Sequence, residues 1–104
     1  RSSWGVDKWS VRFNCAKREL TDDQLTTLAS EFAGARECAY IELDFARNRI
    51  TSEGFSKVIQ VCRCCPKLKI LKLFGNQIGD LAAGLFADLF KACQALEELH
   101  LSHN

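Results

Sequence analysis

Three asparagines recur at one fixed interval, and this interval constrains the fold more than any other feature of the chain. Asn48, Asn76 and Asn104 are each 28 residues apart. Four columns of apolar residues keep the same interval: Leu43, Leu71 and Leu99; Phe45, Leu73 and Leu101; Tyr40, Leu68 and Leu96; Ile50 and Ile78. A period of this length indicates that each unit is one supersecondary element, which buries its apolar face only by stacking on its neighbours.

Each unit has two halves with different periodicities. The first half alternates, as in "LKILKLF", and predicts a short strand with one buried face. The second half has apolar residues at helical spacing and predicts a helix with one buried stripe. The residues expected in this stripe are Phe55, Val58, Ile59 and Cys62 in one unit, and Ala83, Phe86, Ala87 and Phe90 in the next, widened by Leu85 and Leu89.

An earlier and more degenerate unit precedes these two. Leu25, Leu28, Ala29 and Phe32 match the first stripe, Phe13 and Cys15 take the strand positions, and Arg18 stands where the asparagine would be. Thr21 or Asp22 is suited to cap its helix. We expect Trp4 and Trp9 to cover the open end, as terminal repeats need atypical sequence. The predicted organisation is a cap at 1–10, a degenerate repeat at 11–39, repeats at 40–67 and 68–95, and a truncated repeat at 96–104.

The repeated phrases resemble the leucine-rich repeat family. They read "YIELDFARNRI" at 40–50, "LKILKLFGNQI" at 68–78 and "LEELHLSHN" at 96–104. The period, the helix that begins at Gly54, and the phrases "CPKL" and "CQAL" resemble the ribonuclease-inhibitor-like subtype. Arg18 and Ala82, which stands where Gly54 is in the preceding repeat, depart from that pattern. The resemblance implies an α/β solenoid, a right-handed superhelix of about three repeats, with a parallel sheet inside and helices outside. We expect the chain to be a fragment of a longer array, with further repeats beyond Asn104.

The composition fits one globular domain without a strong attraction to polyanions. The 104 residues are 47% hydrophobic and 26% charged, and the net charge is +1. A charge this close to zero predicts no general affinity for nucleic acid or membrane surfaces. No apolar run reaches the roughly 20 residues of a membrane span, and no secretory signal is present. The stretch 54–79 has five basic residues and no acidic one, but parallel stacking places Lys72 beside Asp44 and Lys69 beside Glu97.

Six cysteines leave three interpretations open: a zinc site, a disulfide framework, or reduced thiols. "CRCCP" at 62–66, with His100 and His103, has residue types that bind zinc. Reduced thiols are favoured because Cys15, Cys62, Cys65 and Cys93 all fall in apolar columns, whereas Cys38 and Cys64 have no assigned column. We therefore expect a cytoplasmic protein without a metal or cofactor.

The residues that point outward from the strands are the candidate binding surface. No phosphate loop, nucleotide fingerprint or catalytic triad is present, so we expect no enzymatic activity. The resemblance implies a scaffold that binds another protein on the concave sheet. An alternative is a regulator of a small GTPase resembling the Ran GTPase activator, with Arg47 as an electrostatic helper. The predicted contact residues are Arg12, Asn14, Glu42, Asp44, Arg47, Lys72, Phe74, Glu98 and His100, and Asn48, Asn76 and Asn104 are predicted to be structural.

Overall fold

The computed structural model describes residues 3–104, and strands and helices alternate along the chain. The first two residues of the expected cap lie outside the described residues. The elements in chain order are β1 (Arg12–Asn14), α1 (Asp22–Ala35), β2 (Glu42–Asp44), α2 (Ser52–Arg63), β3 (Ile70–Lys72), the 3₁₀ helix η1 (Asp80–Leu85), α3 (Phe86–Ala92) and β4 (Glu98–His100).

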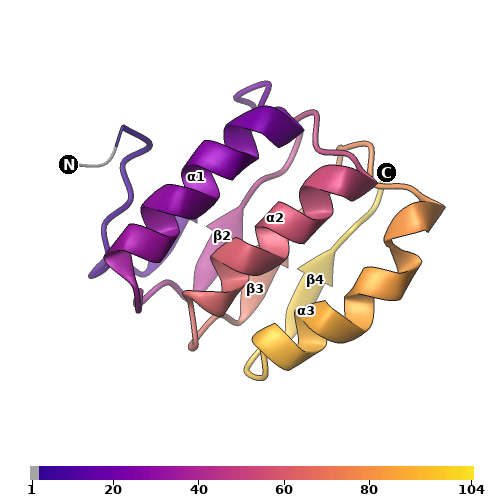
Figure 1. Ribbon diagram of the computed structural model, residues 1–104. Helices are drawn as coiled ribbons and strands as arrows, with labels where there is room; N and C mark the ends of the chain where they lie inside the picture. The colour runs from indigo at the N-terminus through magenta and orange to yellow at the C-terminus, as the bar shows by residue number, and fades with distance from the viewer. Residues whose placement is uncertain (1–2) are drawn as a thin grey trace.

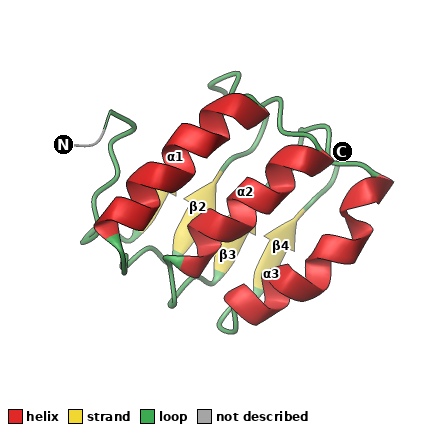
Figure 2. Ribbon diagram, viewed as in Figure 1, coloured by secondary structure: helices red, strands yellow, loops and turns green. Residues whose placement is uncertain are grey.

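The molecule has two layers, a sheet and a layer of helices that covers one of its faces (Figures 1 and 2). The strands form a four-stranded parallel sheet in chain order β1-β2-β3-β4. The helices lie side by side in the same order. The predicted α/β architecture with a parallel sheet is therefore confirmed.

The strand register aligns the apolar columns of the sequence. Phe13 pairs with Leu43, Leu43 with Leu71, and Leu71 with Leu99. Phe13, Leu43 and Leu71 are buried under the helices, but Leu99 is only partly buried, as is Leu101. Both were expected in the core. They remain partly exposed because β4 is an edge strand that follows the last described helix, whereas Phe13 on the other edge strand packs against Phe32 of α1, with 5.2 Å between the ring centres.

A side-chain network fixes the N-terminal ends of α1 and α2. The Thr21 hydroxyl caps α1 in a capping box with Gln24. The Asp22 carboxylate instead accepts hydrogen bonds from the backbone N–H and hydroxyl of Thr51, the residue that caps α2. Gly54 leaves room for this carboxylate, since a Cβ there would lie 2.0 Å from Asp22 Oδ1. The two helices are thus joined through one carboxylate.

The third helix corrects the predicted buried stripe. Ala82 and Leu89 are buried and Leu85 and Phe86 are partly buried, whereas Phe90 is 53% exposed. Ala83 and Ala87 are exposed too. The physical reason is the 3₁₀ turn: Gly79 provides no side-chain cap, and the first N–H groups bond three residues back, as in Ala82 N–H to Gly79 O at 3.0 Å. A 3₁₀ helix turns about 20° more per residue than an α-helix, so about five residues rotate the following positions by roughly one α-helical step, and Leu89 faces the core in place of Phe90.

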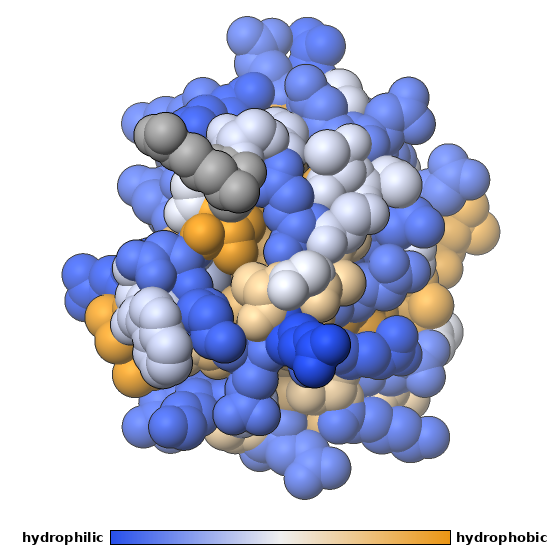
Figure 3. All heavy atoms as spheres, turned by 60° about the vertical axis from the view of Figure 1, so that its left-hand side comes forward, coloured by the Kyte–Doolittle hydropathy of each residue, from blue (hydrophilic) through white to orange (hydrophobic). Residues whose placement is uncertain are grey.

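The N-terminal segment covers the first unit only in part. Trp4 packs against the core, but Trp9 is 78% exposed, so the expected covering role of Trp9 is wrong. The ammonium of Lys8 lies 5.2 Å from the Trp9 ring centre instead. The view that brings this side forward shows a mainly hydrophilic surface with small, separate hydrophobic patches (Figure 3).

Candidate functional site

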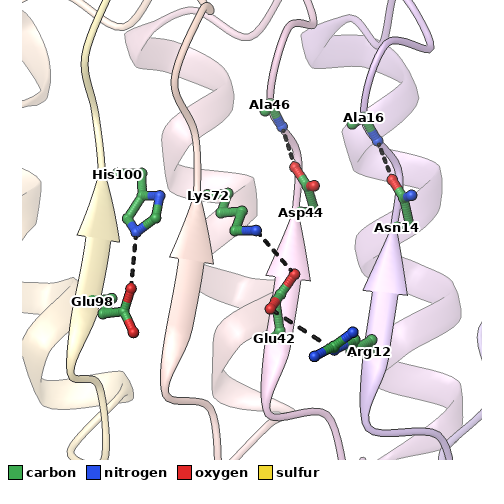
Figure 4. Close-up of polar contacts among 9 residues, drawn as sticks. All are labelled: Arg12, Asn14, Ala16, Glu42, Asp44, Ala46, Lys72, Glu98 and His100. Carbon is green, nitrogen blue, oxygen red and sulfur yellow. Dashed lines mark hydrogen bonds and ion pairs between the residues drawn. The ribbon is translucent and has the colours of Figure 1, made fainter.

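The candidate contact residues lie on or beside the face of the sheet that no helix covers, and we call this surface the open face. Its strand residues alternate with the buried ones, as their burial shows. Figure 4 shows Arg12, Glu42, Lys72, Glu98 and His100 on this face, with the helices behind the sheet. Arg47 and Phe74 follow the C-terminal ends of β2 and β3. The register therefore brings residues from four units onto one surface.

Ion pairs connect the middle of the open face across neighbouring strands. Glu42 accepts from Lys72 at 3.3 Å and lies 4.0 Å from Arg12 (Figure 4). Lys72 is in register with Asp44, as predicted, but its ion pair is with Glu42. Glu98 Oε1 lies 3.2 Å from His100 Nε2 on β4. Because these groups are partly exposed, each pair contributes little to stability, about 0–1 kcal/mol, and remains available to a partner.

Two of the predicted contact residues have a local structural task. Asn14 Oδ1 accepts from the backbone N–H of Ala16, and Asp44 Oδ1 accepts from that of Ala46, each at 3.0 Å (Figure 4). These are turns in which a short polar side chain replaces a backbone acceptor. Both side chains therefore hold the chain where it leaves the strand.

An aromatic and cationic cluster lies at the C-terminal ends of β2, β3 and β4. The Arg47 guanidinium is 5.4 Å from the Phe74 ring centre, and the Phe74 and His100 rings are 6.5 Å apart. Phe74 is half-buried and not fully exposed as expected, because these two side chains flank its ring. A shallow depression of about 640 Å³ adjoins the cluster, and it is lined by Arg47, Phe74, Leu99, His100, Leu101, Ser102 and His103.

The N-terminal ends of the strands carry an apolar strip that the sequence predictions missed. Val11 and Ile41 are exposed and Ile70 is half-buried. Together with Arg12 and Glu42 they line a second depression of about 190 Å³. Ile70 lies on the outward side of the alternating pattern in β3. Val11 and Ile41 directly precede the first residues of β1 and β2. Extending the alternation by one residue assigns Val11 and Ile41 to the buried side, so the sequence pattern carried no signal for their exposure.

The asparagines form a row inside the turns. Asn76 Oδ1 accepts from Ile50 N–H at 3.0 Å, and its Nδ2 donates to the carbonyls of Phe45 and Leu73 at 2.9 and 3.0 Å. Asn48 and Asn104 make equivalent bonds in their own turns. Each amide therefore joins its own turn to the turn of the preceding unit.

The cysteines are free thiols, five buried and Cys64 half-buried. Cys38 has no column in the sequence, yet it is buried in the core, and its backbone N–H donates to Cys64 O at 2.7 Å. Burial raises the pKa of the Cys38 and Cys65 thiols, and also that of Cys15. In the Cys62–Cys93 pair, the thiol–thiol hydrogen bond raises the pKa of Cys62 and lowers that of Cys93. Within residues 3–104, no three Cys, His, Asp or Glu side chains are grouped to hold a metal ion.

Comparison with known proteins yields one match. Residues 64–87, from the loop before β3 into α3, match the family model described as Leucine Rich repeat. Neither the curated proteins nor the solved structures contain a significant match. Over the described part of the chain, no helix is long and apolar enough to cross a membrane. The matched segment, together with the parallel sheet in which Leu43, Leu71 and Leu99 are in register, supports a leucine-rich repeat family for this chain.

Proposed function

We propose that this chain is a non-enzymatic module that binds a partner protein through the open face. We also propose that its units stack as a ribonuclease-inhibitor-like solenoid of about three repeats, which would curve the open face into a concave surface. The observation that carries the proposal is the Arg47–Phe74–His100 cluster, which lies at the C-terminal ends of the strands, beside the open face.

The composition of the open face supports this proposal. Energetically important interface residues are enriched in aromatic side chains and arginine, and they are surrounded by polar groups that exclude water. The Arg47–Phe74–His100 cluster supplies the aromatic and arginine side chains, and the ion pairs around Glu42 supply the surrounding polar groups. The apolar strip of Val11, Ile41 and Ile70 adds a second patch at the other end of the strands. A partner that covers both ends would contact all four strands.

The polar side chains of the open face support a binding role over a catalytic one. Asn14 and Asp44 are engaged in turns, and Glu42 is held between two cations. A general acid or base needs a group within hydrogen-bond reach of a substrate and a second group that orients it. Asp44 and Glu42 therefore contact groups of their own chain, and the partly exposed ion pairs of Glu42 can be exchanged for contacts with a partner protein.

The test is a capture experiment that compares two double variants of matched chemistry. Phe74→Ala with Lys72→Glu changes the open face, and Phe90→Ala with Lys91→Glu makes the same changes on exposed positions of α3. Each tagged protein is incubated with cell extract, and the bound proteins are identified by mass spectrometry. We expect a partner that is captured by wild type and the α3 variant and lost from the open-face variant.

Two results would contradict the proposal. One is equal capture by both double variants, and the other is loss of capture only when α3 is changed. Circular dichroism melts of all three proteins separate loss of binding from loss of folding. The Phe74 and Lys72 changes remove one half-buried ring and one surface ion pair, so we expect both variants to remain folded.

A further inference from the structure

Four consecutive turns place one residue each in the same left-handed conformation. These residues are Lys17, Arg47, Gly75 and His103, with φ of 57°, 57°, 71° and 58°. We call them the turn row. Backbone hydrogen bonds place them side by side: Lys17 N–H donates to Ala46 O, Arg47 N–H to Phe74 O, and Gly75 N–H to Ser102 O. The row therefore runs across the C-terminal edge of the sheet, from β1 to β4.

Glycine adopts this conformation without cost, but other residues do not. The left-handed region costs an L-residue about 1–2 kcal/mol. Three of the four positions nevertheless carry long basic or imidazole side chains, and the fourth shows that the turn accepts glycine. Non-glycine residues held in such conformations are concentrated at functional sites, where the strain is tolerated for the sake of the side chain.

Gly75 gives Arg47 the space for its position over Phe74. A Cβ built on Gly75 would lie 3.1 Å from Arg47 Cγ and 3.4 Å from Arg47 Cα. Any side chain at this position would therefore press on the stem of Arg47. Without one, the guanidinium rests 5.4 Å from the Phe74 ring centre, an arrangement in which the ring face stabilises the cation.

The cations of the turn row have no acidic partner in their own chain. Within the described residues, Lys17, Arg47 and His103 take part in no ion pair of 4.0 Å or less. The nearby Glu19 pairs with Arg49 at 3.8 Å, and Asp44 Oδ1 accepts from the Ala46 backbone. The Phe74 ring therefore orients the Arg47 guanidinium, and no carboxylate of the described residues forms an ion pair with it.

From this geometry we propose that the turn row binds an acidic segment of the partner protein, with an Asp or Glu carboxylate on Arg47. This inference rests on the proposed function and names the chemistry of its ligand. A guanidinium matches a carboxylate with two parallel hydrogen bonds, and stacking fixes its orientation beforehand. Phe74 and Leu101 beside the row offer apolar contact to the neighbouring residues of the same segment.

A peptide fits this surface better than a nucleic acid does. The row has two fixed cations, whereas nucleic-acid sites neutralise many phosphates with a broad basic surface. Phe74 is the one aromatic ring of the open face, so a run of bases would lack a stacking platform.

The experiment measures fluorescence anisotropy of labelled octaglutamate titrated with the whole chain. Octaglutamine is the neutral control, and oligothymidine of equal length is the polyanion control. We expect octaglutamate to bind, octaglutamine not to bind, and oligothymidine to bind more weakly. Arg47→Gly should weaken octaglutamate binding at least tenfold, or about 1.4 kcal/mol, because it removes the charge-assisted hydrogen bonds to a carboxylate.

Arg47→Gly also separates binding from folding. Since glycine relieves the left-handed strain, we expect the thermal midpoint of this variant to stay level or rise while its affinity falls. Lys17→Gly should behave in the same way with a smaller loss of affinity. Arg63→Gln removes an equal charge from the exposed end of α2 and should change affinity less than twofold.

Three results would overturn the inference. They are unchanged octaglutamate binding by Arg47→Gly, an equal loss in Arg63→Gln, and tighter binding of oligothymidine than of octaglutamate. The last would show a general polyanion site. If partner capture depends on Phe74 and Lys72 while octaglutamate fails to bind, the inference fails and the proposed function stands. If octaglutamate binding depends on Arg47 while the open-face double variant still captures the partner, the proposed function fails instead.

Discussion

At the scale of single residues, the asparagine row satisfies backbone groups that the helices and strands leave unpaired. Asn76 is buried and serves one N–H and two carbonyl groups. Burying such groups without a partner costs about 1–3 kcal/mol each. The asparagines are therefore as important to the fold as the leucines, although they contribute no apolar area.

The first prediction follows from this arrangement. We expect Asn76→Ala to lower the free energy of unfolding by about 3 kcal/mol, since three buried backbone groups lose their partner. Asn104→Ala removes equivalent bonds at an exposed position, where water replaces the amide, and should cost about 1 kcal/mol. Urea denaturation of the two variants measures the difference. Equal losses would show that burial of the amide is unimportant.

At the scale of elements, the junction of α1 and α2 depends on the absence of a side chain at Gly54. Alanine normally favours a helix over glycine by about 1 kcal/mol. At residue 54, however, the new methyl group would displace the Asp22 carboxylate from Thr51. Loss of the hydrogen bonds that Thr51 donates to Asp22 costs about 1 kcal/mol, and the close approach to Ile50 Cγ2 at 3.1 Å adds to this cost.

The second prediction compares two glycines in helices. Gly54→Ala should lower the thermal midpoint, whereas Gly34→Ala in α1 should raise it, because a Cβ there meets nothing within 4 Å. The expected changes in unfolding free energy are about 1–2 kcal/mol down and about 0.5–1 kcal/mol up. Calorimetry of both variants checks the signs. A stabilised Gly54→Ala would mean that the Asp22 carboxylate moves aside without cost.

The elements also show how much of the structure the sequence could predict. The recurring Leu43, Leu71 and Leu99 predicted the parallel strands and their order, since residues with equal roles in stacked units must align. The buried stripe of α3 was predicted in part: Leu85, Phe86 and Leu89 pack in or against the core as expected, whereas Ala83, Ala87 and Phe90 are exposed. Whether "GDLAAG" begins as an α or a 3₁₀ turn depends on a cap that Gly79 does not supply, and this choice moves the stripe from Phe90 to Leu89.

The candidate site was predictable to a similar extent. Alternation along the strands placed Glu42 and Lys72 on the open face before any contact was known. Their ion pair was not foreseen, because side-chain reach decides between Asp44 and Glu42. The packing of Arg47 on Phe74 depends on the turn conformation and on the missing side chain of Gly75. The 28-residue interval predicts neither the turn conformation nor its effect on Arg47.

At the scale of the whole molecule, five of the six cysteines are buried in the hydrophobic core. Burial raises the pKa of Cys15, Cys38, Cys62 and Cys65, although for Cys62 the hydrogen bond with Cys93 is the larger cause. The folded state therefore holds these protons more tightly than the unfolded chain. Their contribution to stability is complete below the unfolded pKa of about 8.5 and is lost as the pH rises through the folded values.

The third prediction is alkaline destabilisation. We expect the thermal midpoint, measured with a reducing agent present, to be level from pH 7 to 8 and to fall from pH 8.5 to 9.5. Each thiol that stays protonated in the folded state but ionises in the unfolded chain lowers the free energy of unfolding by up to about 1.4 kcal/mol per pH unit. The lowered pKa of Cys93 offsets the contribution of one of them. Cys65→Ala should be less stable at pH 7 and should lose less between pH 8.5 and 9.5. A pH profile identical to wild type would contradict the assignment.

The asparagine row also has a consequence for the time at which the chain can fold on the ribosome. Each amide completes the turn of the unit before it: Asn48 accepts from Leu20 N–H, and Asn76 accepts from Ile50 N–H. A newly made turn must therefore wait for the asparagine that follows about one unit later. At about 5–20 residues per second, this delay is on the order of 1–6 s. The units would then become stable one after another, each locked by the synthesis of its successor.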